Sequence, residues 1–141
     1  MRRTRWLVGM AFMLLAGMAG YLWLKAPYAQ HEASVVALAF MSLLQQERME
    51  QAYDLTFKRQ RELSEFRDFA KHQLCTRSPM RLAWFHPPQS NGNRLRRWLH
   101  GRQLEMESLT ARFEGDCLIS VELRLDDMGR WRVHSFQSTA G

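Results

Sequence analysis

The distribution of apolar and polar residues divides the chain into an uncharged N-terminal stretch and a longer part with regular periodicities. Trp6 to Leu24 form a run of 19 residues without a charged side chain. As an α-helix, such a run is about 28 Å long, which matches the ~30 Å hydrocarbon core of a bilayer. We therefore predict a transmembrane helix, acting as a signal anchor, at residues 6–24.

Basic residues are distributed unevenly around this run. Arg2, Arg3 and Arg5 precede it, whereas Lys25 alone follows it closely. Positive charge is retained on the cytoplasmic side of a membrane, so this asymmetry predicts a cytoplasmic N-terminus at residues 1–5 and an exported remainder. The predicted location is the bacterial inner membrane, with a single pass and the C-terminal domain in the periplasm.

A cleaved signal peptide is the alternative interpretation of the same run. Leu7 to Leu15 would form its apolar core, and Gly17-Met18-Ala19 has the small-x-small pattern of a cleavage site. The product would be a soluble periplasmic protein. The run continues through Tyr21 to Leu24, beyond the usual end of a secretory peptide, and this favours the anchor.

Helical periodicity follows a predicted linker at residues 25–31. Apolar residues spaced by three and four predict an amphipathic helix from Glu32 to Gln46 and a shorter one from Met49 to Phe57. Ser64 is the expected N-cap of a third helix.

The periodicity changes to two after residue 79. Strands are predicted at residues 80–86, 104–113, 117–125 and 131–136, with a bulge in the second of them. Residues 87–93 contain two prolines and a Ser-Asn-Gly-Asn sequence, and are predicted to be a loop.

Strand alternation also assigns faces in the last strand. The residues predicted to point toward the helices are Trp131, Val133 and Ser135. Those predicted on the outer face are Arg132, His134 and Phe136.

Helices followed by an antiparallel meander predict a single α+β domain at residues 32–141. Phe40 to Leu44, Met49 to Tyr53 and Gly129 to Phe136 resemble the opening helices and closing strand of the nuclear transport factor 2-like superfamily. The similarity covers roughly residues 32–138 and is greatest to small bacterial membrane-anchored members of unassigned role. It implies a cystatin-like, cone-shaped fold.

The net charge is +6, from 20 Lys and Arg against 14 Asp and Glu. Four of the basic residues flank the run at residues 6–24, so the exported part is nearly neutral. A nearly neutral domain outside the cytoplasm is not expected to bind nucleic acid.

Cys75 and Cys117 both lie in the predicted exported part. In an oxidising compartment they are candidates for a disulfide, which would close a loop of about 43 residues and contribute ~4 kcal/mol in the chain-entropy model. Two buried free thiols are the alternative.

No catalytic, metal-binding or cofactor-binding motif occurs in the sequence. The adjacent Asp126 and Asp127 fit a hairpin turn better than an acid–base pair. None of the histidines lies at ligand spacing from another His or a Cys, and His134 is interpreted as structural; the five are His31, His72, His86, His100 and His134. We therefore predict no catalytic residue, no metal and no cofactor.

The densest basic segment outside the N-terminus is the candidate interaction patch, which comprises Arg94, Arg96, Arg97, Trp98 and Arg102. Arginine interleaved with apolar residues suits anionic lipid headgroups, an acidic glycan or the acidic surface of a partner protein. An edge strand protected by its charges is the alternative. Trp84-Phe85 is a second candidate, because adjacent strand residues point to opposite faces and only one of them can be buried.

Two functions remain open at this point. The favoured one is an interaction or assembly module that is held in the membrane by a single span and binds other envelope proteins. The alternative is a small-ligand binder or enzyme that uses the interior of the cone, as polyketide cyclases and isomerases of the superfamily do. A deep pocket containing Tyr53, His72 or Glu122 would favour the second function.

Overall fold

The computed structural model describes residues 2–28, 30–58, 61–75 and 79–139 of the chain, and in the first helix it describes the side chains of residue 6 and of residues 9–25. The chain forms two compact units. Unit 1 comprises Met1–Ala29 and Gln89–Glu105, and unit 2 comprises Gln30–Pro88 and Met106–Gly141. Residues 89–105, predicted to belong to the C-terminal domain, thus group with the N-terminal helix.

Unit 1 contains helix α1 (Arg2–Lys25) and helix α5 (Asn91–Leu99). The large apolar side chains of α1 lie exposed on all sides of the helix and include Met10, Phe12, Leu14, Leu15, Met18, Leu22 and Trp23. Considering only the described residues, no helix combines the length and the apolar character that crossing a membrane demands.

Helix α5 corrects the predicted loop and overturns the alternative of an edge strand for this part of the sequence. Residues 91–93 are its first turn and not a loop, and the arginine-rich segment that follows is helical and not an edge strand. The local reason is capping at both ends: the Ser90 side chain accepts a hydrogen bond from the backbone N–H of Asn93, and Gly101 adopts a φ of +66° after the last turn. The backbone N–H groups of Gly101 and Arg102 then bond back to the carbonyls of Trp98 and Arg97.

Unit 2 is an α+β structure of helices followed by a four-stranded antiparallel meander in the order β1-β2-β3-β4. This confirms the predicted class and is compatible with a cone-like fold. Its helices are α2 (His31–Gln45), α3 (Met49–Asp54) and α4 (Leu63–Gln73). Its strands are β1 (Arg81–His86), β2 (Ser108–Glu114), β3 (Leu118–Leu125) and β4 (Trp131–Thr139).

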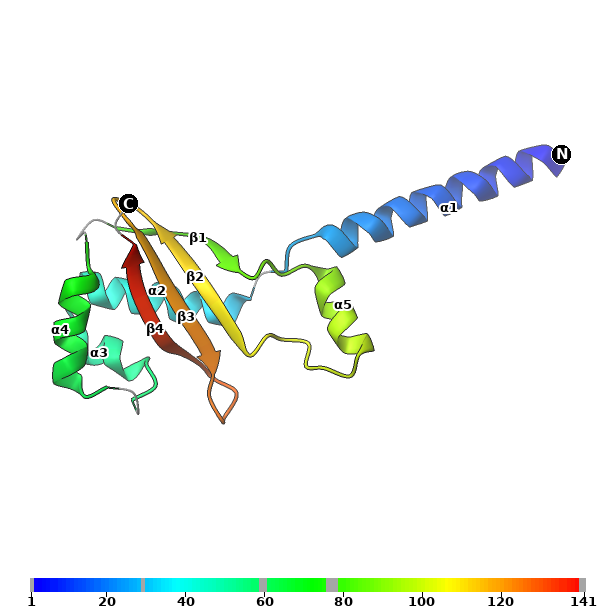
Figure 1. The fold of residues 1–141 in the computed structure, drawn as a ribbon. Helices are drawn as coiled ribbons and strands as arrows, with labels where there is room; N and C mark the ends of the chain where they lie inside the picture. The colour runs from blue at the N-terminus through cyan, green and yellow to red at the C-terminus, as the bar shows by residue number, and fades with distance from the viewer. Residues whose placement is uncertain (1, 29, 59–60, 76–78, 140–141) are drawn as a thin grey trace. The chain divides into compact units, whose positions relative to one another are not determined.

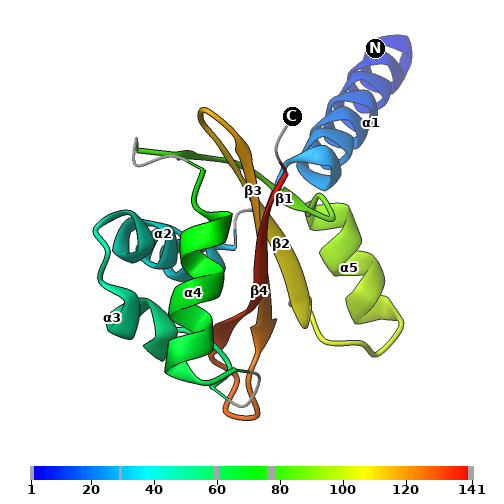
Figure 2. The same ribbon diagram turned by 60° about the vertical axis from the view of Figure 1, so that its left-hand side comes forward.

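All three helices of unit 2 lie on one side of its sheet, and α2 runs across that side (Figures 1 and 2). The predicted stripe of α2 is buried and consists of Ala33, Ala37, Phe40 and Leu44. The sheet contributes Leu109, Ala111, Phe113, Ile119, Val121, Leu123, Trp131, Val133 and Phe136 to the same core. The core therefore fills the space between the sheet and the helices.

The boundaries of several elements differ from the prediction. Helix α3 ends at Asp54 because the next residues pair with β4: the Phe57 N–H donates to the Val133 carbonyl, and the Val133 N–H donates to the Leu55 carbonyl. Helix α4 has Glu62 and not Ser64 as its N-cap, without a side-chain cap bond. Strand β2 begins later than predicted, and its pairing with β3 is continuous, without the predicted bulge.

Register shifts occur instead in β1, between Leu82 and Trp84, and in β4, where a bulge reverses the predicted faces of the second half of the strand. Ser135 pairs with Glu122 while Val133 pairs with Leu123, so His134 is an extra residue between two pairs. Beyond the bulge, Phe136 points into the core and is 5% exposed, whereas Ser135 faces solvent. The predicted outer position of Phe136 is therefore wrong.

Phe136 is the centre of an aromatic cluster that joins the helices to the sheet. The centre of its ring lies 5.1 Å from the ring centres of Phe40 of α2 and Phe69 of α4, and 6.0 Å from that of Phe66 of α4. The contacts with Phe40 and Phe69 are edge-to-face, which is a favoured arrangement of aromatic rings.

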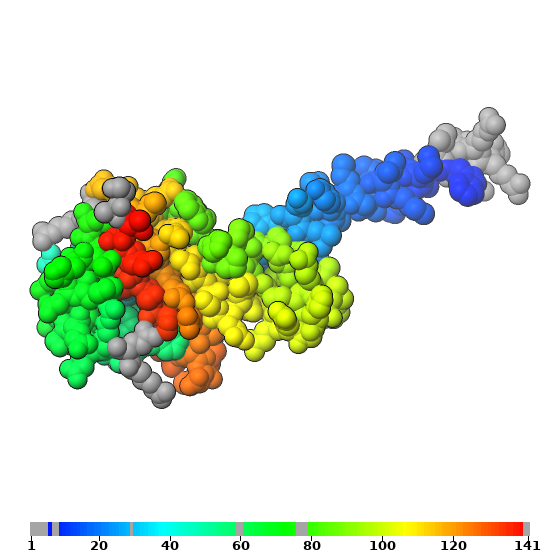
Figure 3. All heavy atoms as spheres, viewed as in Figure 1, coloured from blue at the N-terminus to red at the C-terminus, as the bar shows by residue number. Residues whose placement is uncertain are grey.

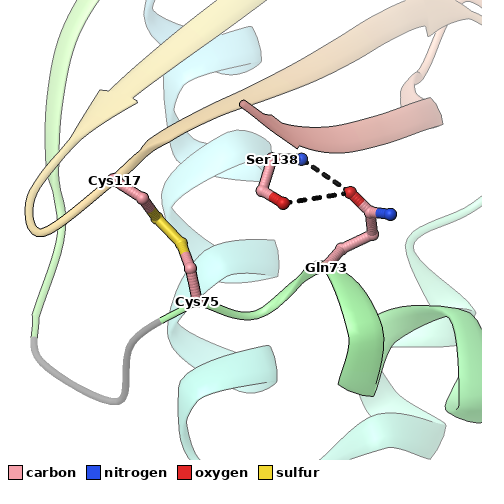
Figure 4. Close-up of a disulfide and its surroundings, with 4 residues drawn as sticks. All are labelled: Gln73, Cys75, Cys117 and Ser138. Atoms are coloured by element: carbon pink, nitrogen blue, oxygen red, sulfur yellow. Dashed lines mark hydrogen bonds between the residues drawn. A yellow bond between two sulfur atoms is a disulfide. The ribbon is translucent and has the colours of Figure 1, made fainter. Parts of the chain in front are cut away.

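A disulfide joins Cys75, after α4, to Cys117, in the turn before β3, with the two Cα atoms 6.4 Å apart (Figure 4). This confirms the predicted pairing. Nearby, the side-chain oxygen of Gln73 accepts hydrogen bonds from the backbone N–H and the hydroxyl of Ser138, at 2.7 and 3.2 Å. The end of α4 is thus attached covalently to the turn before β3 and by hydrogen bonds to β4.

Replacement of Phe136 by Ala tests the position of the bulge. We expect Phe136→Ala to lower the free energy of unfolding by ~3–5 kcal/mol, because it removes a buried ring with three aromatic neighbours. Gln137→Ala, at the next and exposed position, should change it by less than about 0.5 kcal/mol. Chemical denaturation measures both values. Similar small losses in the two variants would show that the strand follows simple alternation without the bulge.

Candidate functional site

The sheet face that points away from α2, α3 and α4 is the first candidate surface, and it is called the open sheet face here (Figure 3). Trp84 of β1 lies there, 49% exposed, and pairs with Arg112 of β2. The Arg112 guanidinium donates a hydrogen bond to the hydroxyl of Ser120 on β3. Phe85 packs against the core on the other side of the sheet. Of the predicted pair, Trp84 is therefore the exposed member.

Glu122 lies in the middle of the open sheet face and is held by its neighbours. Its carboxylate accepts hydrogen bonds from the Arg124 guanidinium at 2.7 and 2.9 Å and from the Ser135 hydroxyl at 3.0 Å. Burial by itself raises the pKa of Glu122, but these bonds and the charges of Arg124 and His134 outweigh it, so the pKa is lowered. A carboxylate held in the ionised form presents negative charge and is poorly suited to act as a general acid.

Asp126 stabilises the turn between β3 and β4. Its carboxylate accepts hydrogen bonds from the backbone N–H groups of Met128 and Arg130, each at 2.9 Å, and from the Arg130 side chain at 3.0 Å. The backbone bond from Arg130 is the main cause of the lowered pKa of Asp126. This geometry assigns Asp126 to the turn, as predicted.

A small hollow of about 70 Å³ lies between α3, α4 and β4. Tyr53, Arg61, Phe69 and His134 are among its lining residues. The Tyr53 hydroxyl donates to the Arg61 carbonyl at 2.7 Å, and the Arg61 guanidinium lies 3.7 Å from the centre of the Phe69 ring. The hollow is much smaller than the ~300–1,000 Å³ of typical ligand pockets.

The other histidines do not gather into a site. His72 lies exposed on α4, outside the hollow, and its Nδ1 is 2.7 Å from the Asp68 carbonyl oxygen. His31, His86 and His100 are also exposed. Within the described ranges, no group of three His, Cys, Asp or Glu residues is placed to hold a metal ion.

The predicted interaction patch lies on and after α5, and two of its arginines are used inside unit 1. Arg94 forms an ion pair with Glu105 at 2.8 Å, and its guanidinium stacks on the Tyr28 ring at 3.7 Å. Arg97 donates to the Gln89 side-chain oxygen at 2.9 Å and to the Leu104 carbonyl at 2.7 and 3.1 Å. These two side chains fix α5 to the segments on either side of it.

The remaining patch residues, Arg96, Trp98 and Arg102, are exposed. Two apolar neighbours, Leu95 and Leu99, join them at the surface. Spacing by three and four residues among Leu95, Trp98 and Leu99 was the signal of a helix in the sequence. Arg2, Arg3 and Arg5, from which the membrane topology was predicted, have side chains outside the described part of the structure.

Comparisons with protein-family models, with curated proteins and with solved structures find no match to this chain.

Substitution of the two neighbouring arginines of α5 should separate their roles. We expect Arg97→Ala to cost about 1–2 kcal/mol of local stability, because the Leu104 carbonyl and the Gln89 amide lose their donor, and so to speed amide exchange in α5 roughly 5- to 30-fold. Arg96→Ala should leave the exchange rates within about twofold of wild type. Hydrogen–deuterium exchange on the full chain in detergent measures both effects. Equal protection in the two variants would contradict the assigned role of Arg97.

The stability that is lost on substitution of Asp126 should depend on pH in a defined direction. A carboxyl with a lowered pKa in the folded state stabilises the fold while it is ionised, and this stabilisation is lost as the pH falls through the folded-state pKa. We therefore expect Asp126→Asn to melt below wild type at pH 7, with the difference shrinking as the medium is acidified. Asp127→Asn is the control and should melt like wild type. A difference for Asp126→Asn that grows on acidification would contradict the assignment.

Proposed function

We propose that the chain is a single-span protein of the bacterial inner membrane whose unit 2 lies in the periplasm and binds other envelope proteins. The observation that carries the proposal is the exposure of large apolar side chains on every side of α1, for example Phe12 at 74% and Leu15 at 60%. A helix that is apolar all round needs an apolar environment, and none of the residues that the structure describes covers these side chains. The described residues alone contain no helix fit to span a membrane, so the proposal also depends on the full uncharged run Trp6 to Leu24.

Two further observations support the periplasmic location of unit 2. Arg2, Arg3 and Arg5 precede the uncharged run, which favours retention of the N-terminus in the cytoplasm. Cys75 and Cys117 form a disulfide, and disulfides persist in the periplasm but are rare in the cytoplasm.

The open sheet face supports a role in protein binding. It presents an exposed tryptophan beside an arginine, and both residue types are enriched in protein interfaces. The opposite face of the sheet is filled by packed apolar side chains of α2 and the strands, which favours docking on the surface over ligand binding in an interior cavity. Membership of the nuclear transport factor 2-like superfamily is part of the same proposal, and the order of helices before an antiparallel meander supports it.

A C-terminal alkaline phosphatase fusion of the full chain tests location and docking together. We expect an active enzyme that sediments with the membrane fraction, because phosphatase folds only outside the cytoplasm. In this fusion, a photoreactive benzoylphenylalanine at position 84 should give discrete crosslinked products in intact cells.

The matched control carries the same photoreactive residue at Lys71, an exposed position on α4. An inactive fusion, or an active fusion released into the soluble periplasm, would reject the anchored topology. An active, membrane-bound fusion with the same products at positions 71 and 84, or with none at either, would reject the open sheet face as the docking surface.

A further inference from the structure

Helix α5 presents an apolar face that no described part of the chain covers. Leu95, Trp98 and Leu99 lie along one side of this helix and are 37%, 60% and 67% exposed. None of the nine residues of α5 is buried. An exposed side of this composition indicates contact with something outside the chain.

The start of α5 is fixed at the end of α1. The side-chain amide of Asn91 donates to the Trp23 carbonyl at 3.1 Å, and the Asn91 backbone N–H donates to the Ala26 carbonyl at 3.2 Å. Tyr28 and Gln89 add a backbone hydrogen bond of 2.9 Å. Because Leu24 is the last residue of the uncharged run, α5 begins at the level where this run ends.

Two residues of the apolar face, Leu95 and Leu99, lie on the side of α5 that faces α1. Gly92 lies against α1: a Cβ at this position would be 3.1 Å from the Leu24 carbonyl oxygen. Leu95 and Leu99 follow Gly92 at i+3 and i+7, and so share its side of the helix, as does Arg96 at i+4. Trp98, at i+6, lies about 120° around the helix axis from Gly92. In Figures 1 and 2, α5 leaves the end of α1 at a steep angle and does not continue its direction.

Uncompensated positive charge borders this apolar face. Arg96 and Arg102 make no ion pair or side-chain hydrogen bond with any described residue, whereas Arg94 and Arg97 are bonded within unit 1. A guanidinium binds phosphate in a bidentate manner and is only weakly hydrated, so it suits the headgroup layer of a membrane. Tryptophan is enriched at the same depth.

We propose that α5 lies in the interface of the membrane that holds α1, with Leu95, Trp98 and Leu99 toward the acyl chains and with Arg96 and Arg102 on phosphates of anionic phospholipids. This inference rests on the proposed anchoring of α1. The position of α5 at the end of the uncharged run favours lipid over a second copy of the chain or another protein, because a membrane around α1 necessarily reaches the first turn of α5.

Nitroxide spin labels on the full chain in nanodiscs of phosphatidylglycerol test the proposal. Both native cysteines are in the disulfide, so one introduced cysteine is the only free thiol. Leu99→Cys reports on the apolar face, and His100→Cys, at the exposed C-cap that follows α5 and about 100° around the helix axis from Leu99, is its matched control. Power-saturation EPR measures how accessible each label is to oxygen, which concentrates in lipid, and to a water-soluble nickel complex. We expect the label at position 99 to be more accessible to oxygen and the label at position 100 to the nickel complex.

A third label, at Leu15→Cys, separates this proposal from the anchoring on which it rests. A label at position 15 accessible to the nickel complex would reject the anchor. A lipid-exposed label at position 15 with a water-exposed label at position 99 would retain the anchor and reject the interfacial position of α5. Loss of both accessibilities at position 99, with dipolar broadening between labels, would show a second copy on this face and would also reject the proposal.

Variants of Arg96 and Arg102 test the proposed contacts of these side chains with phosphates. Each variant carries the spin label at Leu99→Cys. Removal of both charges by Arg96→Gln with Arg102→Gln should shift the ratio of lipid-bound to free α5 toward the free form by roughly 30-fold, since each cation favours an anionic surface about fivefold. Arg96→Lys with Arg102→Lys should retain most of the binding. An unchanged ratio in the glutamine variant would show that these arginines do not bind the headgroups.

Discussion

Burial of one face of the β-meander under α2 is the constraint on which the rest of the structure depends. Phe40, fully buried in the middle of α2, contacts Phe136 of β4 and Phe66 of α4, so a single ring joins three elements. Once this core is filled by α2, α3 and α4, it contains no residue from α5. The apolar residues of α1 and α5 belong to unit 1 and contribute nothing to this core.

The sequence predicted the parts of the fold that local pattern determines. Ile119, Val121 and Leu123 alternate with more polar residues and are buried as expected, and the α2 stripe followed its helical period. The face of Phe136 could not be derived in this way, because one bulge residue, His134, changes the register by one position. Whether a strand contains a bulge depends on its partner strand, which local alternation does not describe. The caps Ser90 and Gly101 of α5 were visible, but two prolines and a Ser-Asn-Gly-Asn sequence favoured a loop.

The candidate patch illustrates a second limit of sequence reasoning. Arg94, Arg96 and Arg97 stand within four positions of each other, yet their environments differ completely. Arg94 is held by Tyr28, which is far away in the sequence, and by Glu105, whereas Arg96 remains at the surface. Pairwise contacts between distant segments decide which arginine is structural and which is available, and no local pattern reports these contacts. The predicted patch therefore did not separate the two kinds of arginine in this segment.

The chain contains 17 arginines against 3 lysines. The same properties of the guanidinium group suit it to contacts inside the structure and to contacts at the proposed membrane surface. Inside the structure, the planar guanidinium stacks on aromatic rings: Arg94 lies 3.7 Å from the centre of the Tyr28 ring, and Arg61 lies 3.7 Å from that of Phe69. At the proposed membrane surface, the same planar group can bond two phosphate oxygens at once and loses little hydration on leaving bulk water. An ammonium group performs both tasks less well, since it is compact and strongly hydrated. Lysine substitution is therefore expected to preserve charge attraction at Arg96 and Arg102, but not the stacking that holds Arg94 on Tyr28.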